Sequence, residues 1–178
     1  MRTKTYRTAL GGITSALALV FLFLGGVLPF ASILGPVLSS MVVEIFMCEF
    51  GKKNAFIMYI SVSVLSLLIA PDRECALLFL FFLGWYPMFK EISERKLNRI
   101  PCFLSKIAAL NISVGLMYWL LIHVLGMSDL AADFAAYTAV MYVILIVLAN
   151  ITFLLADRLY TKMAAMYFRN WRAKLVRK

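Results

Sequence analysis

Few side chains in this sequence could do chemistry, and most of them lie in long apolar stretches. Glu44 lies inside such a stretch, where a carboxylate that faced lipid would cost on the order of 2–3 kcal/mol or more. We therefore expect Glu44 either to face other helices or to be neutral. It could be a proton or cation site, or it could form a structural hydrogen bond to a neighbouring helix. His123 is the only histidine, and it follows Trp119 by four residues, which places both side chains on one helical face.

Other polar and aromatic residues are expected to gather near one end of the helices, beside two acidic residues. Aromatic residues near a membrane surface usually form a belt at the interface, but with acidic neighbours they can also line a pocket for a small ligand. The candidate ligand-binding residues are Asp72, Glu74, Asn111, Tyr118, Trp119, His123 and Tyr137. Asn111 can instead pair with Asn150 between two helices, a hydrogen bond worth roughly 0.6–2 kcal/mol.

The motifs of the common membrane enzymes and ATPases are absent from the sequence. It contains no GxxxxGK[ST] phosphate-binding loop, no HExxH and no GxSxG, and its three cysteines are scattered. We therefore expect neither an enzyme nor a bound metal or cofactor. A membrane enzyme that uses Glu44 or His123 is the weakest alternative, because neither residue has a second catalytic group at a suitable spacing.

The elements that must position these residues are membrane-spanning helices. The 178 residues are 63% hydrophobic and 15% charged, whereas soluble domains are nearer half apolar and a quarter charged. A bilayer core requires about 20 apolar residues per helix. The gaps between charges then predict an all-α bundle of six transmembrane helices near residues 8–28, 31–50, 55–71, 76–89, 104–126 and 134–157. The first stretch is too long for the apolar part of a cleaved signal peptide.

The lysine and arginine residues predict how this bundle is oriented. If successive loops alternate between the two sides, 17 of the 18 basic residues lie on one side and only Arg73 lies on the other. Cytoplasmic loops of membrane proteins carry such an excess, so both termini are expected inside. The stretch 76–89 is short and could be re-entrant, but five basic residues would then move outside, which favours a full crossing. A bacterial cytoplasmic membrane fits this short, basic, multi-pass chain.

The net charge of +9 does not indicate a nucleic-acid partner. The basic residues lie at helix ends and in the tail, where they face the anionic lipids of the bilayer. The transmembrane domain is expected to comprise residues 1–157, followed by a basic tail over residues 158–178. Aromatic and apolar residues recur at helical spacing in this tail, beginning with Tyr160, Met163 and Tyr167. This pattern predicts an amphipathic helix at the inner membrane surface, or one that docks onto a cytoplasmic partner.

The first helix carries small residues on one face. Thr8, Gly12 and Ala16 are spaced by four residues, and Ser15 lies beside them. In a membrane, small residues at this spacing allow the backbone of another helix to approach closely. We therefore predict that this flat face is available for contact with another helix.

The chain is predicted to form six helices with both ends inside, within 178 residues, and its first helix carries Gly12-Ile-Thr-Ser-Ala16. In these features it resembles the S component of energy-coupling factor transporters. In that family the helix-one motif is typically Ala-x-x-x-Ala, and here glycine replaces the first alanine. The resemblance implies a subunit that binds a small solute at an outward-opening site. It also implies a coupling membrane protein and ATPase subunits as partners. The alternative is a non-transporting scaffold subunit of a bacterial cell-shape or division assembly.

Overall fold

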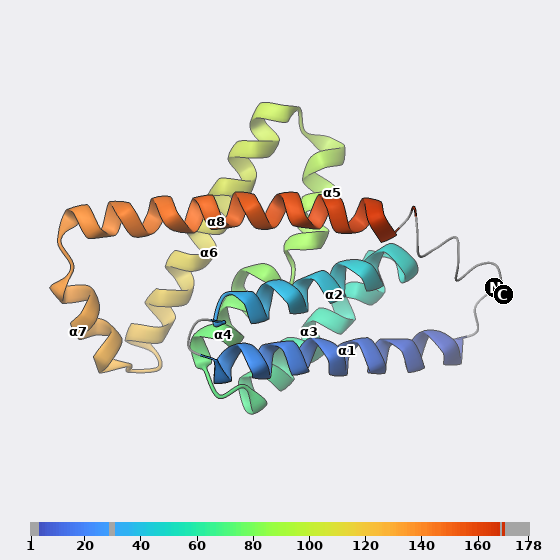
Figure 1. Cartoon of the computed structure of the whole chain (residues 1–178), viewed down its shortest axis with the longest axis horizontal. Helices are drawn as coiled ribbons and strands as arrows, with labels where there is room; N and C mark the ends of the chain where they lie inside the picture. Colours follow the sequence, from blue (N-terminus) through green and yellow to red (C-terminus); the bar gives the residue numbers. More distant parts are fainter. Residues whose placement is uncertain (1–3, 29–30, 168, 170–178) are drawn as a thin grey trace.

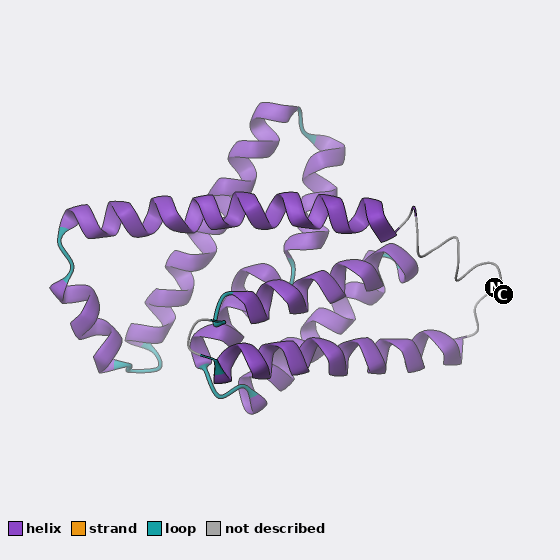
Figure 2. Cartoon of the chain, viewed as in Figure 1, coloured by secondary structure: helices purple, strands orange, loops and turns teal. Residues whose placement is uncertain are grey.

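The computed structural model describes residues 4–28, 31–167 and 169, and almost all of them are helical (Figures 1 and 2). No strand occurs in these ranges, so the expected all-α class is confirmed. The elements are α1 (Lys4–Val27), α2 (Leu34–Phe50), α3 (Lys52–Ile69), α4 (Arg73–Leu78), the π-helical turn η1 (Phe79–Leu83), α5 (Tyr86–Lys96), α6 (Arg99–His123), α7 (Ser128–Ala136) and α8 (Ala139–Met166).

Within the described residues, five helical stretches are long and apolar enough to cross a membrane, which is the pattern of a multi-pass membrane protein. They are Thr5–Val27, Lys52–Ile69, Arg73–Lys96, Arg99–His123 and Ala139–Met166. The second of the six predicted spans corresponds to α2, whose 17 residues make it one residue shorter than the shortest of these five. α2 lies at the centre of the molecule, in contact with α1, α3, α4, α5 and α8, and eleven of its 17 residues are buried.

α1 packs mainly on α2, through a face that carries small residues at a spacing of seven: Gly11, Ala18 and Gly25. A Cβ atom on Gly25 would lie only 2.7 Å from the Cα atom of Gly35, so the two helix backbones are in contact at this point. The intramolecular contact therefore uses a different face from the one formed by Thr8, Gly12 and Ala16. Those three residues are exposed, while Ser15 lies at the border and is half-buried.

The fourth predicted span is a single stretch of 24 residues that a π-helical turn interrupts. The turn forms because the N–H of Gly84 donates to the carbonyl of Phe79, five residues earlier, at 2.7 Å. Gly84 also lies directly under the ring of Tyr59 from α3, where a Cβ atom would approach Tyr59 Cδ2 to 2.5 Å. The stretch extends beyond the predicted limits of 76–89 at both ends.

Side chains complete the hydrogen bonding of this interrupted segment, as the interior of a membrane protein requires. Tyr59 Oη donates to the carbonyl of Leu80 at 2.7 Å, and Trp85 Nε1 donates to the carbonyl of Phe81 at 2.6 Å. Pro87 has no N–H to offer the carbonyl of Leu83, and the Ser40 hydroxyl from α2 donates to that carbonyl instead. The interruption is therefore tied to both α2 and α3.

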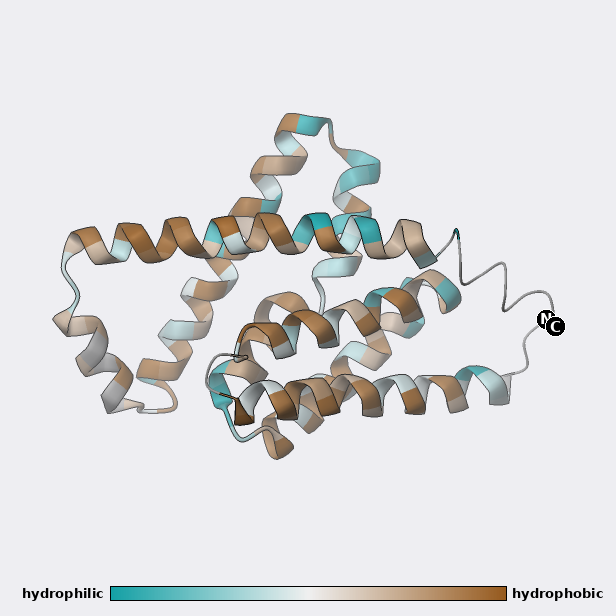
Figure 3. Ribbon diagram, viewed as in Figure 1, coloured by the Kyte–Doolittle hydropathy of each residue, from teal (hydrophilic) through white to brown (hydrophobic). Residues whose placement is uncertain are grey.

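The last part of the chain is less enclosed. α6 crosses α8 obliquely, and α7 forms a separate short helix before α8 where the sixth span was predicted to begin (Figure 1). Residues 139–149, the first part of α8, are all exposed and strongly hydrophobic (Figure 3). α8 then continues without a break across the expected domain limit at 157 to Met166. The rest of the expected tail lies outside the described residues, apart from Tyr167 and Arg169.

Two aromatic residues at the described start of that tail are buried against the bundle. Tyr160 is fully buried, and Tyr167 is 7% exposed. The hydroxyl of Tyr167 donates to Glu49 Oε2 of α2 at 2.6 Å. A polar group of the bundle thus holds Tyr167, and the interfacial placement of the tail stays a prediction.

Candidate functional site

The most concentrated group of charged side chains lies between α5, α6 and α8, and Asp157 is at its centre. The carboxylate of Asp157 accepts a hydrogen bond from Tyr86 Oη at 2.5 Å and pairs with Lys90 Nζ at 2.9 Å and Lys106 Nζ at 3.1 Å. Lys106 Nζ also pairs with Glu94 Oε1 at 2.7 Å. The lysine side chains are only 6% and 9% exposed. We call these five residues the inner ionic cluster.

The arrangement follows from helical spacing. Tyr86, Lys90 and Glu94 are spaced by four residues, so they share one face of α5. Lys90 Nζ additionally donates to the backbone carbonyl of Asp157 at 2.8 Å and to Thr161 Oγ1 at 2.7 Å, so it contacts two successive turns of α8. Buried charges are tolerated only when they are paired and hydrogen-bonded, and here two cations meet two carboxylates.

Glu44 lies behind this cluster, on the central helix α2. It is 6% exposed, so its side chain lies against other helices. Its Oε2 atom has no hydrogen-bond partner in the part of the chain that the structure describes. Electrostatic attraction from Lys90 and repulsion from Asp157 both reach Glu44. Among the described residues, Glu44 Oε2 is therefore a buried carboxyl oxygen near the cluster that has no direct partner.

A cavity of about 310 Å³ opens beside the inner ionic cluster. It lies where α5 ends and α6 begins, against the middle of α8. Its lining combines charged groups with apolar side chains and consists of Glu94, Leu97, Arg99, Cys102, Phe103, Lys106, Phe153, Leu154 and Asp157. Pockets for small molecules have this composition, apolar walls with a few polar groups, and volumes that begin near 300 Å³.

The candidates from the sequence lie at the other end of the helices, and four of them come near one another. Asp72 caps α4 by accepting the N–H of Glu74 at 2.9 Å. Tyr118 lies within electrostatic range of Asp72, Glu74 and Tyr137. The rings of Tyr118 and Tyr137 both pack on Phe134, with centroids 5.1 Å and 5.6 Å away. These residues form what we call the outer rim.

The other candidates make contacts of their own. Trp119 is 56% exposed and stacks on His123, with ring centroids 5.4 Å apart and planes 16° from parallel. Asn111 exchanges hydrogen bonds of 3.2 Å and 3.3 Å with Asn150 of α8. The alternative interpretation of Asn111, as an interhelical partner of Asn150, is thus the one that the structure supports.

Sequence reasoning missed the inner ionic cluster. The positive-inside rule treats Lys90 and Lys106 only as charges on the cytoplasmic side. The signal in the sequence that could have indicated the cluster is the spacing of Tyr86, Lys90 and Glu94. Polar residues spaced by four lie on one face of a helix and can contact a common partner on another helix.

Among the described residues, no group of three or more histidine, cysteine or acidic side chains could hold a metal ion. Comparison of the chain with protein-family models, with curated proteins and with solved structures found no match.

Proposed function

We propose that the chain crosses the membrane six times with both termini in the cytoplasm, and that it is the substrate-binding subunit of an uptake system for a small solute. A separate membrane protein would couple it to ATPase subunits, as in the energy-coupling factor transporters that it resembles. The observation that carries the proposal is the exposed face of small residues on α1.

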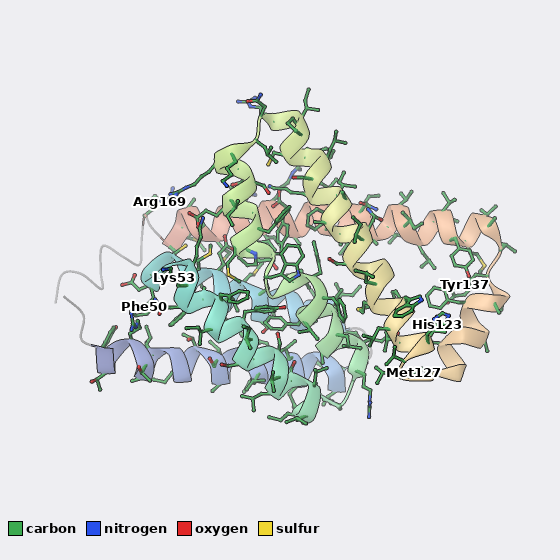
Figure 4. The ribbon with its side chains drawn as sticks, turned by 180° about the vertical axis from the view of Figure 1, so that it is seen from behind. Phe50, Lys53, His123, Met127, Tyr137 and Arg169 are labelled. Carbon is green, nitrogen blue, oxygen red and sulfur yellow. The ribbon has the colours of Figure 1, made fainter. Side chains whose placement is uncertain are left out.

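The two ends of the molecule support the proposed topology. Phe50, Lys53 and Arg169 lie near one end, and His123, Met127 and Tyr137 lie near the opposite end (Figure 4). The first group contains Lys53 and Arg169, two of the basic residues that are expected in the cytoplasm. α2 is short for a crossing, about 26 Å at 1.5 Å per residue, but its central position and its burial suit a helix that other helices surround.

The exposed face of small residues on α1 is more specific evidence for a partner helix than an apolar surface alone would be. Thr8, Gly12 and Ala16 are exposed, and a Cβ atom added to Gly12 would meet no atom of this chain within 4 Å. Most of the other exposed residues of α1 are bulky, and Ile13 and Val20, for example, are 66% and 51% exposed. Only the small-residue face allows close backbone contact, which drives helix association in membranes. The outer rim, at the other end, would receive the solute.

The double variant Gly12→Leu with Ala16→Leu tests the proposal. Its new side chains point away from this chain, so the variant folds, but they fill the flat face. We expect affinity purification of the wild type from its native membrane in mild detergent to recover a coupling membrane protein and an ATPase. The variant should recover at least about tenfold less of both, a loss of about 1.4 kcal/mol.

The matched control is Ile13→Phe with Val20→Leu, which adds bulk to the lipid-facing side of the same helix and should retain the partners. Full recovery of the partners by the Gly12→Leu, Ala16→Leu variant contradicts the proposed contact. A wild-type sample that brings down no ATPase contradicts the proposed function itself. Retention of a small molecule through purification, measured by mass spectrometry, separates a binding subunit from a scaffold.

A further inference from the structure

The cavity beside the inner ionic cluster has two kinds of wall. One side is apolar, formed by Leu97, Phe103, Phe153 and Leu154. The other side carries two carboxylates and two cations. It includes Lys106, which is 7% exposed and is held in place by two ion pairs. A site with one apolar and one charged wall suits a ligand that is itself amphiphilic.

The charges determine the sign of the ligand. The carboxylate of Asp157 already accepts from three donors, and Glu94 is paired with Lys106. Arg99 has no ion-pair or hydrogen-bond partner among the described residues, and it is exposed at the cavity. Among the charged residues of the lining, Arg99 is therefore the one that has no counter-ion in the described part of the chain. A cation entering the cavity would find no free carboxylate pair, whereas an anion would find a free guanidinium.

Local structure adds to this preference. Arg99 and Cys102 belong to the first turn of α6, a helix of 25 residues whose N-cap Asn98 makes no side-chain capping hydrogen bond. The positive end of the helix dipole therefore lies at the cavity, and it favours negative charge there. Arginine also matches phosphate and carboxylate groups through paired N–H donors.

We propose that this cavity binds an anionic amphiphile, whose phosphate or carboxylate group pairs with Arg99 while its apolar part lies against Phe103 and Phe153. An anionic phospholipid and a free amphiphilic solute share this chemistry. The site is separate from the outer rim and from the face of α1, so this proposal does not depend on the proposed transport function.

Cys102 provides a local probe, because it lines the cavity and the other two cysteines do not. The full chain is placed in nanodiscs of phosphatidylcholine alone or of equal parts phosphatidylcholine and phosphatidylglycerol. The rate at which N-ethylmaleimide modifies each cysteine is then followed by peptide mass spectrometry. A third sample contains phosphatidylcholine nanodiscs with hexyl phosphate as the soluble anionic amphiphile.

We expect an anionic amphiphile to slow modification of Cys102 at least about threefold, as a site about two-thirds occupied requires, with no change at Cys48. The variant Arg99→Gln should lose this protection. Arg95→Gln should keep it, because Arg95 is 75% exposed, pairs with Glu91 and lies outside the cavity lining. Protection by phosphatidylglycerol identifies a lipid headgroup as the source, and protection by hexyl phosphate alone identifies a free solute.

Equal rates at Cys102 in all three samples, or equal protection in wild type and Arg99→Gln, overturn the proposal. If Cys102 reacts too slowly to measure, native mass spectrometry of the protein from the mixed nanodiscs replaces the labelling. Wild type and Arg95→Gln should then retain more bound phosphatidylglycerol than Arg99→Gln, and equal retention in all three overturns the proposal.

Discussion

Replacing Asp157 with asparagine tests whether the inner ionic cluster holds α8 in place. Asparagine keeps the size of the side chain and an oxygen that can accept from Tyr86, but it removes the charge that two buried lysines share. Lys106 retains Glu94 at 2.7 Å, whereas Lys90 loses the one ion pair that it makes among the described residues. The variant therefore leaves Lys90, whose side chain is 6% exposed, as a buried cation without an ion-pair partner among the described residues.

Removing one partner of a buried ion pair costs about 3–5 kcal/mol, because the other charge stays desolvated. A chain of this length loses about 2–4 °C of melting temperature per kcal/mol, so we expect a decrease of about 6–20 °C. The double variant Asp157→Asn with Lys90→Met removes both charges and should recover most of this loss, since an apolar group replaces the unpaired cation.

The assay is thermal unfolding of the purified chain in detergent, followed by a thiol-reactive dye that reports exposure of the buried Cys75 and Cys102. Glu91→Gln is the control, because Glu91 is 34% exposed and its pairs with Lys52 and Arg95 are both 3.4 Å long. Such surface pairs contribute about 0–1 kcal/mol. An Asp157→Asn variant as stable as Glu91→Gln, or a double variant no better than Asp157→Asn, would refute the reasoning.

Three further predictions concern the fold and its orientation. Gly84→Ala should lower stability by about 1–3 kcal/mol in the same thermal assay, because its Cβ atom would overlap an aromatic ring of α3. A double-mutant cycle of Asn111→Ala and Asn150→Ala should give a coupling energy of about 0.6 kcal/mol, and additive effects would deny the pair. Alkaline phosphatase fused after Asp72 should be active and fused after Leu97 inactive, since the enzyme folds only outside the cytoplasm. The reverse pattern contradicts the proposed orientation.

The all-α class and the approximate positions of most helices could be predicted from the sequence. The bilayer requires apolar stretches of a certain length, and charged residues mark where these stretches end. The limits of the fourth span could not be predicted, since they depend on how Gly84 packs under Tyr59 and on the donors that Ser40 and Tyr59 supply from other helices. The sequence of the first helix predicts one face of small residues. The structure contains two such faces. Gly11, Ala18 and Gly25, at a spacing of seven, lie on the face that packs on α2, whereas Thr8, Gly12 and Ala16, at a spacing of four, are exposed.

The candidate site was predicted less well, for a reason that the positive-inside rule itself explains. That rule treats lysine and arginine as surface charges near helix ends, so it gives no indication that Lys90 and Lys106 are buried against Asp157. Distinguishing a buried lysine from a surface one requires the partner on a third helix, 51 residues away in sequence for Lys106 and 67 for Lys90. The acidic and aromatic residues of the outer rim could be grouped from the sequence, because adjacent loops bring them together, and a ligand there stays a prediction.

The two ends of α8 are held by different forces, and this difference bears on any motion of the bundle. Its inner part is fixed by the ion pairs of Asp157, by the buried ring of Tyr160 and by the contact between Tyr167 and Glu49. Its outer part, residues 139–149, is exposed on all sides. The described hydrogen bond that holds it to α7 is the one that Tyr142 Oη donates to the carbonyl of Phe134 at 2.7 Å. Segments with few buried contacts open at lower free energy than the global fold. Displacement at the outer rim therefore requires less energy than displacement at the cluster, so a solute at the rim would meet the more adaptable end of the molecule.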